Sequence, residues 1–412
     1  MKRVQVLVIG AGQAGLAMSR CLGQRGIDHV VLERGRVAER WRSERWDSLR
    51  LLTPNWMSRL PGWSYQGSDP HGYMTAAQVS RYLDGYALNF RAPVETGAAV
   101  HSVVAVPGGY RVATGRGTWE AQAVVIATGQ CDVSAVPAMA QHLPASIRQI
   151  TPAGYRNPAC VPGGGVLVVG ASASGVQLAE ELHRAGHPVT IAVGGHTRLP
   201  RTYRGRDIMW WMDRAGVLDE TARPTPDRHR ARPQPSLQLV GHPDRRTINL
   251  AVLRDQGVRV VGRAVDVGDG AVRFRDDLAE TTAAAQARLE RLLARLDASA
   301  RPGDPPAEPE AARPITLGPS PDRIDLASEG IRTVVWATGY ARDYSWLKLP
   351  VLDTAGEIVH RGGVTPMPGL YVLGLPFMRR RKSSFLDGVG ADAEILAQHI
   401  HGGLTATERL AA

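Results

Sequence analysis

Cysteine and long apolar runs are scarce in this chain of 412 residues. Its three cysteines, Cys21, Cys131 and Cys160, form no CxxC pair, which argues against a redox-active dithiol of that type. So little cysteine is typical of the reducing cytoplasm, where we expect this protein to act. No run of about 20 apolar residues occurs, so we expect no membrane span. The opening MKRVQVLVIG is too short in its apolar part for a signal peptide and is interpreted as a strand.

Carboxylates are also outnumbered, because 39 acidic residues stand against 49 lysines and arginines, for a net charge of +10. The basic residues are spread along the chain. Aromatic residues are not interleaved with them as in grooves for single-stranded nucleic acid. We therefore attribute the excess charge to composition and to anionic cofactors. Neither a nucleic-acid partner nor a metal site is expected.

A glycine-rich turn, GAGQAG, follows the first apolar run, which is predicted as a buried strand. Gly10 permits the tight turn and Gly12 lets the backbone approach a pyrophosphate. Gly15 lets the following helix pack closely on the strand. The next strand, HVVLE, ends at Glu33, 18 residues after Gly15, where a carboxylate can bind a ribose hydroxyl. This order predicts a dinucleotide site rather than an unrelated glycine-rich turn.

A second turn of the same kind, GASASG, starts at Gly170 and keeps its third position at Gly175, with Ser172 in place of the middle glycine. No carboxylate follows its second strand. The polar side chains that come instead include His196, Arg198, Arg201 and Arg204. Guanidinium groups bind a ribose 2′-phosphate that a carboxylate would repel, so we expect FAD in the first site and NADPH in the second. Arg198 is the first candidate and Arg201 the second; a solvated basic loop is the alternative.

An internal repeat organises the chain. Each half has a hairpin-like stretch and then a closing ATG, at 127–129 and at 337–339. The turns are 160 residues apart but the closures 210, so the second half carries about 50 more residues. We predict an α/β fold of two dinucleotide-binding (Rossmann-like) domains. The expected parts are an FAD domain (1–155 and 322–412), an NADPH domain (156–277), and an inserted helix with a Pro-rich linker (278–321).

These motifs resemble the flavin-containing monooxygenases, the single-component FAD and NADPH enzymes that include Baeyer–Villiger and plant indole-pyruvate monooxygenases. The resemblance covers most of the chain and includes the segment RWDSLRLLTPNWMSRLPG. It implies that NADPH reduces FAD and that O₂ then gives a C4a-(hydro)peroxyflavin. That species would oxygenate a small organic substrate by N- or S-oxygenation, hydroxylation or Baeyer–Villiger insertion.

The sequence departs from the family at the fingerprint FxGxxxHxxx(Y/F). The matching stretch is IRQITPAGYRNP, in which Tyr155 fits the end while Thr151 stands near the position of the histidine. Loss of that histidine could release peroxide faster. The alternatives are therefore an NADPH oxidase or a reductase that serves a separate acceptor, and, from another class, a non-catalytic flavin-bound sensor.

The resemblance also points to residues around the flavin. We expect Trp41, Trp46 and residues 49–55 to flank the isoalloxazine, with Asn55 and Thr53 as candidate catalytic hydrogen-bonding groups; turn capping is the alternative for both. The last helix should begin near Asp387 with its positive end toward the flavin. The basic run 379–382 could stabilise anionic cofactors or form a solvated face. Residues 208–212, IMWWM, could line a substrate or nicotinamide pocket or pack in the core.

The expected cofactor ligands thus come from both turns, both closures and the last strand and helix. In the first half they are Gly10, Gly12, Gln13, Gly15, Glu33, Arg34, Trp41, Trp46, Thr128 and Gly129. In the second half they are Gly170, Ser172, Ser174, Gly175, Arg198, Arg201, Thr338 and Gly339, and near the end Gly374 and Asp387. The expected partners are a small-molecule substrate and O₂, and a homodimer is allowed for.

Overall fold

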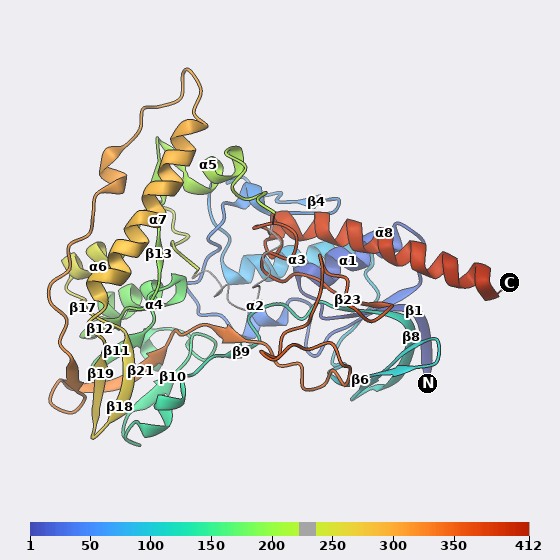
Figure 1. Cartoon of the computed structure of the whole chain (residues 1–412), viewed down its shortest axis with the longest axis horizontal. Helices are drawn as coiled ribbons and strands as arrows, with labels where there is room; N and C mark the ends of the chain where they lie inside the picture. The colour runs from blue at the N-terminus through green and yellow to red at the C-terminus, as the bar shows by residue number, and fades with distance from the viewer. Residues whose placement is uncertain (222–235, 412) are drawn as a thin grey trace.

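The computed structural model describes residues 1–221 and 236–411, which form two α/β domains side by side (Figure 1). Within that part of the chain no helix combines the length and apolarity needed to cross a bilayer. No group of His, Cys, Asp or Glu side chains among the same residues is arranged to hold a metal ion.

The first domain is built on a seven-stranded sheet in the order β5-β2-β1-β8-β7-β6, with β23 also paired to β8. β1 is parallel to both β2 and β8 because the apolar run at its end is buried on both faces, as parallel strands require. α1 packs against α8, the long last helix, which projects from this domain (Figure 1). The elements of the domain are β1 (Lys2–Ile9), α1 (Gln13–Gly23), β2 (His29–Leu32), α2 (Glu39–Ser43), η1 (Asn55–Met57), β3 (Arg59–Leu60), β4 (Trp63–Ser64), α3 (Ala76–Asn89), β5 (Val94–Glu95), β6 (Val100–Val106), β7 (Gly109–Thr114), β8 (Gly117–Ile126), β23 (Leu370–Val372) and α8 (Leu386–Ala411).

The second domain repeats the plan on a five-stranded parallel sheet in the order β10-β21-β11-β12-β17. A separate antiparallel sheet, β18-β19-β20, supplies the hairpin that the repeat predicted. The elements are η2 (Ala138–His142), β10 (Arg148–Ile150), η3 (Pro158–Cys160), β11 (Gly165–Val169), α4 (Ala173–Arg184), β12 (Val189–Ala192), β13 (Thr197–Arg198), β14 (Thr202–Tyr203), β15 (Arg206–Asp207), α5 (Ile208–Arg214), β16 (Leu237–Gln238), α6 (Leu250–Gln256), β17 (Arg259–Val261), β18 (Ala264–Gly268), β19 (Ala271–Phe274), β20 (Arg323–Asp325) and β21 (Ile331–Trp336).

The sheet pairings correct the domain boundaries expected at residues 155 and 322. Both β10 and β21 belong to the second sheet, because β21, the strand before the second ATG closure, pairs with β11 on one side and with β10 on the other. The chain instead crosses between the domains at β9 (Val133–Ser134) and β22 (Tyr340–Ala341), which pair with each other. The FAD domain therefore ends near β9 and resumes after β22.

The insertion forms a helix as expected. α7 (Leu278–Ala298) buries Leu289, Leu293 and Leu296 against the cluster around α5. The Pro-rich stretch that follows contains one short 3₁₀ turn, η4 (Pro309–Ala312), and runs beside α7 before β20 (Figure 1). The inserted helix is therefore an integral part of the second domain.

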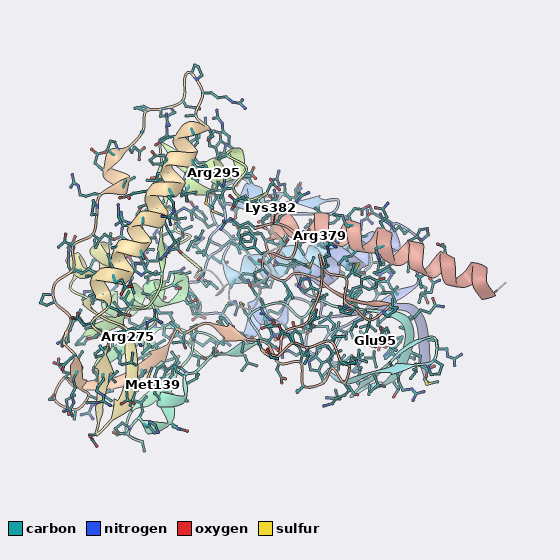
Figure 2. The ribbon with its side chains drawn as sticks, in the orientation of Figure 1. Glu95, Met139, Arg275, Arg295, Arg379 and Lys382 are labelled. Carbon is teal, nitrogen blue, oxygen red and sulfur yellow. The ribbon has the colours of Figure 1, made fainter. Side chains whose placement is uncertain are left out.

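The basic run 379–382 joins the two domains through ion pairs. Arg381 pairs with Glu220 at 2.7 Å, and Lys382 pairs with Asp219 at 3.2 Å. Figure 2 shows Arg379 and Lys382 beside the beginning of α8. Carboxylates of the second domain thus compensate the charge of Arg380, Arg381 and Lys382.

Candidate functional site

The first glycine-rich turn has the geometry that a dinucleotide needs. Gly10 adopts φ +105°, a conformation that side chains strain, and the N-cap of α1 is Gly12 at φ −83° and ψ −169°. A Cβ on Gly15 would lie 1.8 Å from the Gly10 carbonyl oxygen, whereas one on Gly12 would meet nothing within 4 Å. Helix and strand are therefore in backbone contact at Gly15, and open space lies above Gly12 where a pyrophosphate would approach.

A pocket of about 590 Å³ opens over this turn. The predicted ligands that line it are Gly10, Gly12, Gln13, Glu33, Arg34, Trp41, Thr128, Gly129 and Gly374. Lining residues that the sequence analysis did not single out include Arg40, Arg45, Ala98, Cys131, Asp132, Trp346 and Ser384. They carry no motif, although Arg40 and Arg45 flank Trp41 in the sequence. The glycine turn, the carboxylate and the shape of the cavity fit FAD.

The carboxylate of Glu33 is buried at the end of β2, facing the turn. Its oxygens accept the backbone N–H of Ala11 at 2.7 Å and of Gly35 at 2.9 Å. These bonds fix the carboxylate beside the pocket, where a ribose hydroxyl could donate to it. Burial raises the pKa of the Cys131 thiol, another residue of the pocket lining.

The C-terminal segment closes the pocket from the other side. Gly374, at φ +85°, approaches α1 so closely that a Cβ would lie 2.8 Å from the Cβ of Ala14. The Gln13 amide donates to the Ser384 carbonyl at 2.6 Å. Asp387 does not line this pocket and is instead paired with Arg59 and Lys382. Its predicted cofactor contact is therefore wrong, because the first turn of α8 uses this acid to hold neighbouring cations.

Three further predicted residues lie outside the lining of the first pocket, namely Trp46, Thr53 and Asn55. Trp46 is buried in the core of the second domain. The Asn55 amide donates to the Asp69 carbonyl at 2.9 Å and accepts the Met74 N–H at 2.7 Å, so both of its polar ends shape the following loop. Thr53 is half-buried outside the pocket lining. These bonds give Asn55 the loop-shaping role that was the alternative, and one N–H of its amide has no partner among them.

The second turn repeats the backbone of the first. Gly170 adopts φ +107°, and Ser172 is the N-cap of α4 at φ −81° and ψ −171° without a capping hydrogen bond from its side chain. A Cβ on Gly175 would lie 1.8 Å from the Gly170 oxygen, the same distance as in the first half. Serine therefore fits the middle position without altering the turn.

The second turn lies against two neighbouring segments. The Ala173 N–H donates to the Ser236 hydroxyl at 3.3 Å, and the Gln238 amide donates to the Ala171 carbonyl at 2.7 Å. On the closure side, the Thr338 hydroxyl donates to the Ala135 carbonyl at 2.5 Å. Gly339 follows at φ +96°, matching Gly129 at φ +78° in the first closure. Ser174 stands in the first turn of α4 and is half-buried.

Arg198 and Arg201 do not occupy an open phosphate site. Arg198 is 5% exposed, and its Nη2 donates to the Arg313 carbonyl at 2.8 Å. Arg201 is fully buried and pairs with Asp207, while its Nη1 donates to the Leu52 carbonyl at 2.8 Å. Their prediction as direct ligands of a 2′-phosphate is wrong, because one arginine anchors the inserted segment and the other anchors the junction of the domains.

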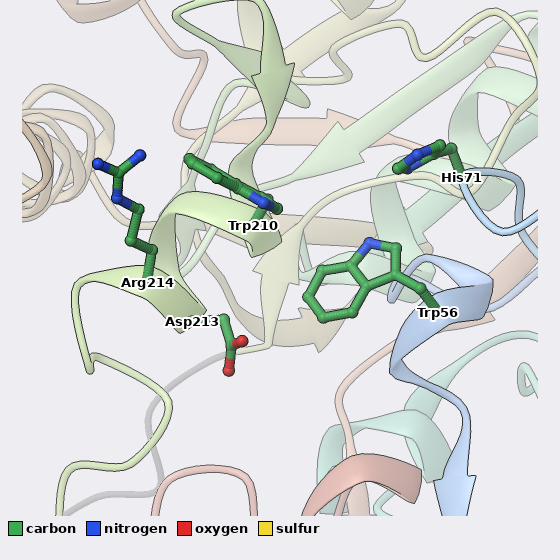
Figure 3. Close-up of a pocket in the computed structure, with 5 residues that line it drawn as sticks. All are labelled: Trp56, His71, Trp210, Asp213 and Arg214. Atoms are coloured by element: carbon green, nitrogen blue, oxygen red, sulfur yellow. The ribbon is translucent and has the colours of Figure 1, made fainter. Parts of the chain in front are cut away.

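The IMWWM segment divides between core and pocket. Four of its five residues, those at positions 208, 209, 211 and 212, are buried. Trp210 lines a second pocket of about 330 Å³ with Trp56, His71, Asp213 and Arg214 (Figure 3). The indoles of Trp56 and Trp210 come from different domains and lie on either side of this space (Figure 3). Both alternatives of the sequence analysis thus apply, each to different residues.

Comparisons with known proteins agree with this architecture. Residues 7–206 match the family described as pyridine nucleotide-disulphide oxidoreductase. A CzcO-like oxidoreductase of Geobacillus kaustophilus is 32% identical over 405 residues, covering 96% of this chain and 98% of that one. The indole-3-pyruvate monooxygenase YUCCA4 of Oryza sativa is 32% identical over 223 residues, which cover 48% of this chain and 49% of that protein.

Among solved structures, a flavin-containing monooxygenase from Stenotrophomonas maltophilia aligns with a TM-score of 0.68 at 20% identity, covering 98% of this chain and 99% of that one. This likeness confirms the predicted fold of two dinucleotide-binding domains. FAD and NADPH are confirmed as cofactors at the level of the family. The chain therefore belongs to the CzcO-like oxidoreductases and shares the fold of the flavin-containing monooxygenase from Stenotrophomonas maltophilia.

Proposed function

We propose that this protein is a flavin monooxygenase that uses NADPH and O₂ to oxygenate a small organic substrate. The observation that carries the proposal is the pair of nucleotide turns with the same backbone geometry, of which the first opens into a cavity that suits FAD. One chain that holds two dinucleotides can pass a hydride from one to the other.

Different residues of the first site would bind different parts of FAD. The open backbone at Gly12 and the N-terminus of α1 face the pyrophosphate, and the Glu33 carboxylate accepts from a ribose hydroxyl. When bound, FAD would supply the chemistry of accepting a hydride from NADPH and of reacting with O₂. Trp41 and the Gly374 backbone wall the pocket and exclude water. The second turn would hold NADPH by the same contacts at α4.

The second pocket, lined by Trp56 and Trp210 and called the aromatic pocket below, is our candidate for the substrate-binding site. It lies where η1 of the first domain meets α5 of the second, and its carboxylate, Asp213, is 3.8 Å from Lys382. Ser384, two residues beyond Lys382, lines the FAD cavity, so one short segment connects that cavity with Asp213 of the aromatic pocket. The relatives named as indole-3-pyruvate monooxygenases make a flat aromatic oxo acid one compound to try, beside amines, thioethers and cyclic ketones.

Replacing Trp210 by alanine should weaken substrate use and spare the coenzyme reaction. Loss of one indole wall is expected to raise the KM of an accepted substrate about tenfold, since an aromatic contact contributes about 0.5–1.5 kcal/mol and tenfold corresponds to about 1.4 kcal/mol. Steady-state NADPH consumption with and without substrate measures both effects, and Trp210→Phe should retain most of the affinity. An unchanged KM in the alanine variant would place the substrate elsewhere.

The proposed function itself is tested by measuring how much of the consumed NADPH leads to oxygenated product rather than to H₂O₂. Purified holoenzyme is given NADPH, O₂ and a panel of candidate substrates, and NADPH loss, H₂O₂ and oxygenated product are measured together. We expect product to account for most of the NADPH consumed with at least one substrate. Stoichiometric H₂O₂ with every substrate would instead favour the NADPH oxidase, the alternative that Thr151 near the fingerprint histidine position supports.

A further inference from the structure

The end of β12 in the second domain corresponds to the end of β2 in the first. Glu33 donates its N–H to the Glu95 carbonyl at 2.9 Å, and Val193 donates to the Val261 carbonyl at 2.9 Å, so these two residues occupy equivalent positions in their halves. The acid that would bind a ribose hydroxyl in the first half is therefore a buried valine in the second. The second site must recognise its ribose by other groups.

In the second half, open space and a guanidinium group lie where the first half has the Glu33 carboxylate. A Cβ on Gly195 would meet no atom within 4 Å, so the backbone there faces open space. A Cβ on Gly194 would lie 3.3 Å from Cζ of Arg263. Arg263 lies two residues beyond Val261, and the equivalent position in the first half, two residues beyond Glu95, is Gly97. The first half thus has a glycine where the second half places a cation.

The inserted helix α7 brings a second cation to the same turn. Arg288 Nη2 donates to the His196 carbonyl at 2.5 Å. Among the described residues, Arg288 Nε and Arg263 Nε are buried without a hydrogen-bond partner. Arg198, beneath them, has an Nη1 in the same condition. Buried donors without acceptors are costly, so the cluster is suited to an anion.

Few carboxylates face this cluster. Asp277 lies 3.5 Å from Arg263, and Glu290 acts on Arg198 only at longer range. Burial lowers the pKa of both Arg198 and Arg288 from the ordinary value, which reflects the cost of keeping uncompensated charge there. A dianionic phosphate would supply both the missing acceptors and the missing charge.

We propose that the insertion selects the coenzyme, with Arg288 of α7 and Arg263 binding the ribose 2′-phosphate of NADPH beside Gly194 and Gly195. Arg198 acts as a positioning residue, because it holds residues 311–313 and so the return of the insertion. This inference rests on the proposed use of the second site by NADPH. It assigns the inserted helix a role in choosing NADPH over NADH.

The test compares two small nucleotides on the FAD-loaded protein by calorimetry. Adenosine 2′,5′-bisphosphate carries the 2′-phosphate and 5′-AMP does not. We expect the wild-type protein to prefer the bisphosphate, and Arg288→Ala and Arg263→Ala each to reduce that preference roughly 10- to 100-fold, as for loss of a hydrogen bond to a charged group. Arg291→Ala is the matched control, since Arg291 is exposed on the same helix, and it should retain the preference.

Two outcomes would overturn the assignment: a wild-type protein that binds both nucleotides equally, or a preference that survives in both arginine variants. Because Arg263 and Arg288 lie on different elements, a folding defect in one variant leaves the other to decide. Failure of the proposed function gives a different result, in which NADPH leaves the flavin oxidised although the bisphosphate still binds by way of these arginines.

Discussion

Alanine at Gly15 is expected to yield a protein without FAD. The new Cβ would lie 1.8 Å from the Gly10 carbonyl oxygen, so the helix must move away from the strand and the turn must open. Displacing the backbone that faces the pyrophosphate should weaken FAD binding roughly 100-fold or more, equivalent to about 3 kcal/mol of overpacking. The flavin content of the purified protein, from its visible absorbance, measures the loss.

The control for this substitution is Gly163→Ala. Gly163 is exposed, and an added Cβ there meets nothing within 4 Å, so flavin content should equal that of the wild type. The circular dichroism spectrum of the Gly15 variant shows whether the rest of the chain still folds. Full flavin occupancy with unchanged affinity in that variant would mean that FAD does not lie on this turn.

Alanine at Gly175 should spare FAD binding and instead impair the reaction with NADPH. Its Cβ would lie 1.8 Å from the Gly170 oxygen, so this variant distorts the second turn and leaves the first intact. The protein should therefore remain yellow, while the second-order rate of flavin reduction by NADPH falls roughly 100-fold or more, from the same overpacking cost. Anaerobic stopped-flow absorbance gives the rate.

A chemical reductant serves as the internal control for the Gly175 variant. Dithionite should reduce its flavin as readily as that of the wild type, because dithionite does not need the second turn. If the variant were reduced by NADPH at the wild-type rate, the second turn would have no part in binding the coenzyme. Loss of FAD from this variant would show that the two turns cannot be separated.

Local spacing explains which parts of the site could be predicted from the sequence. The residues that set each turn lie within six positions of one another, and each strand before a turn is an apolar run. Glu33 follows from its distance to Gly15. These contacts depend on one βαβ unit, whose geometry is fixed by short connections. In the first half, Gly10, Gly12 and Glu33 line the first pocket, whereas Gly15 packs against the strand.

Long-range partners explain the errors. Asp387 pairs with Arg59, 328 residues earlier in the sequence, and Arg198 bonds to a carbonyl 115 residues later. A basic residue after β12 is consistent with a phosphate site, but the sequence does not reveal that the insertion returns to cover it. Trp46 comes early in the chain yet packs in the hydrophobic core of the second domain. That contact depends on how the two domains pack together, which the sequence around Trp46 does not reveal.

The domain boundaries failed for a related reason. The strand before the second ATG was assigned to the first domain because the chain returns there soon afterwards. In the structure, β21 pairs in parallel with β11, as β8 pairs with β1 in the first half. Strand order is set by pairing across the sheet, which the linear sequence does not display.

Anaerobic titration of the FAD-loaded enzyme with NADPH tests most directly whether electrons pass between the two nucleotide sites. The account predicts that the visible flavin absorbance bleaches in proportion to added NADPH, with one equivalent reducing one equivalent of flavin. A flavin that stays oxidised in the presence of excess NADPH, but bleaches with dithionite, would contradict it.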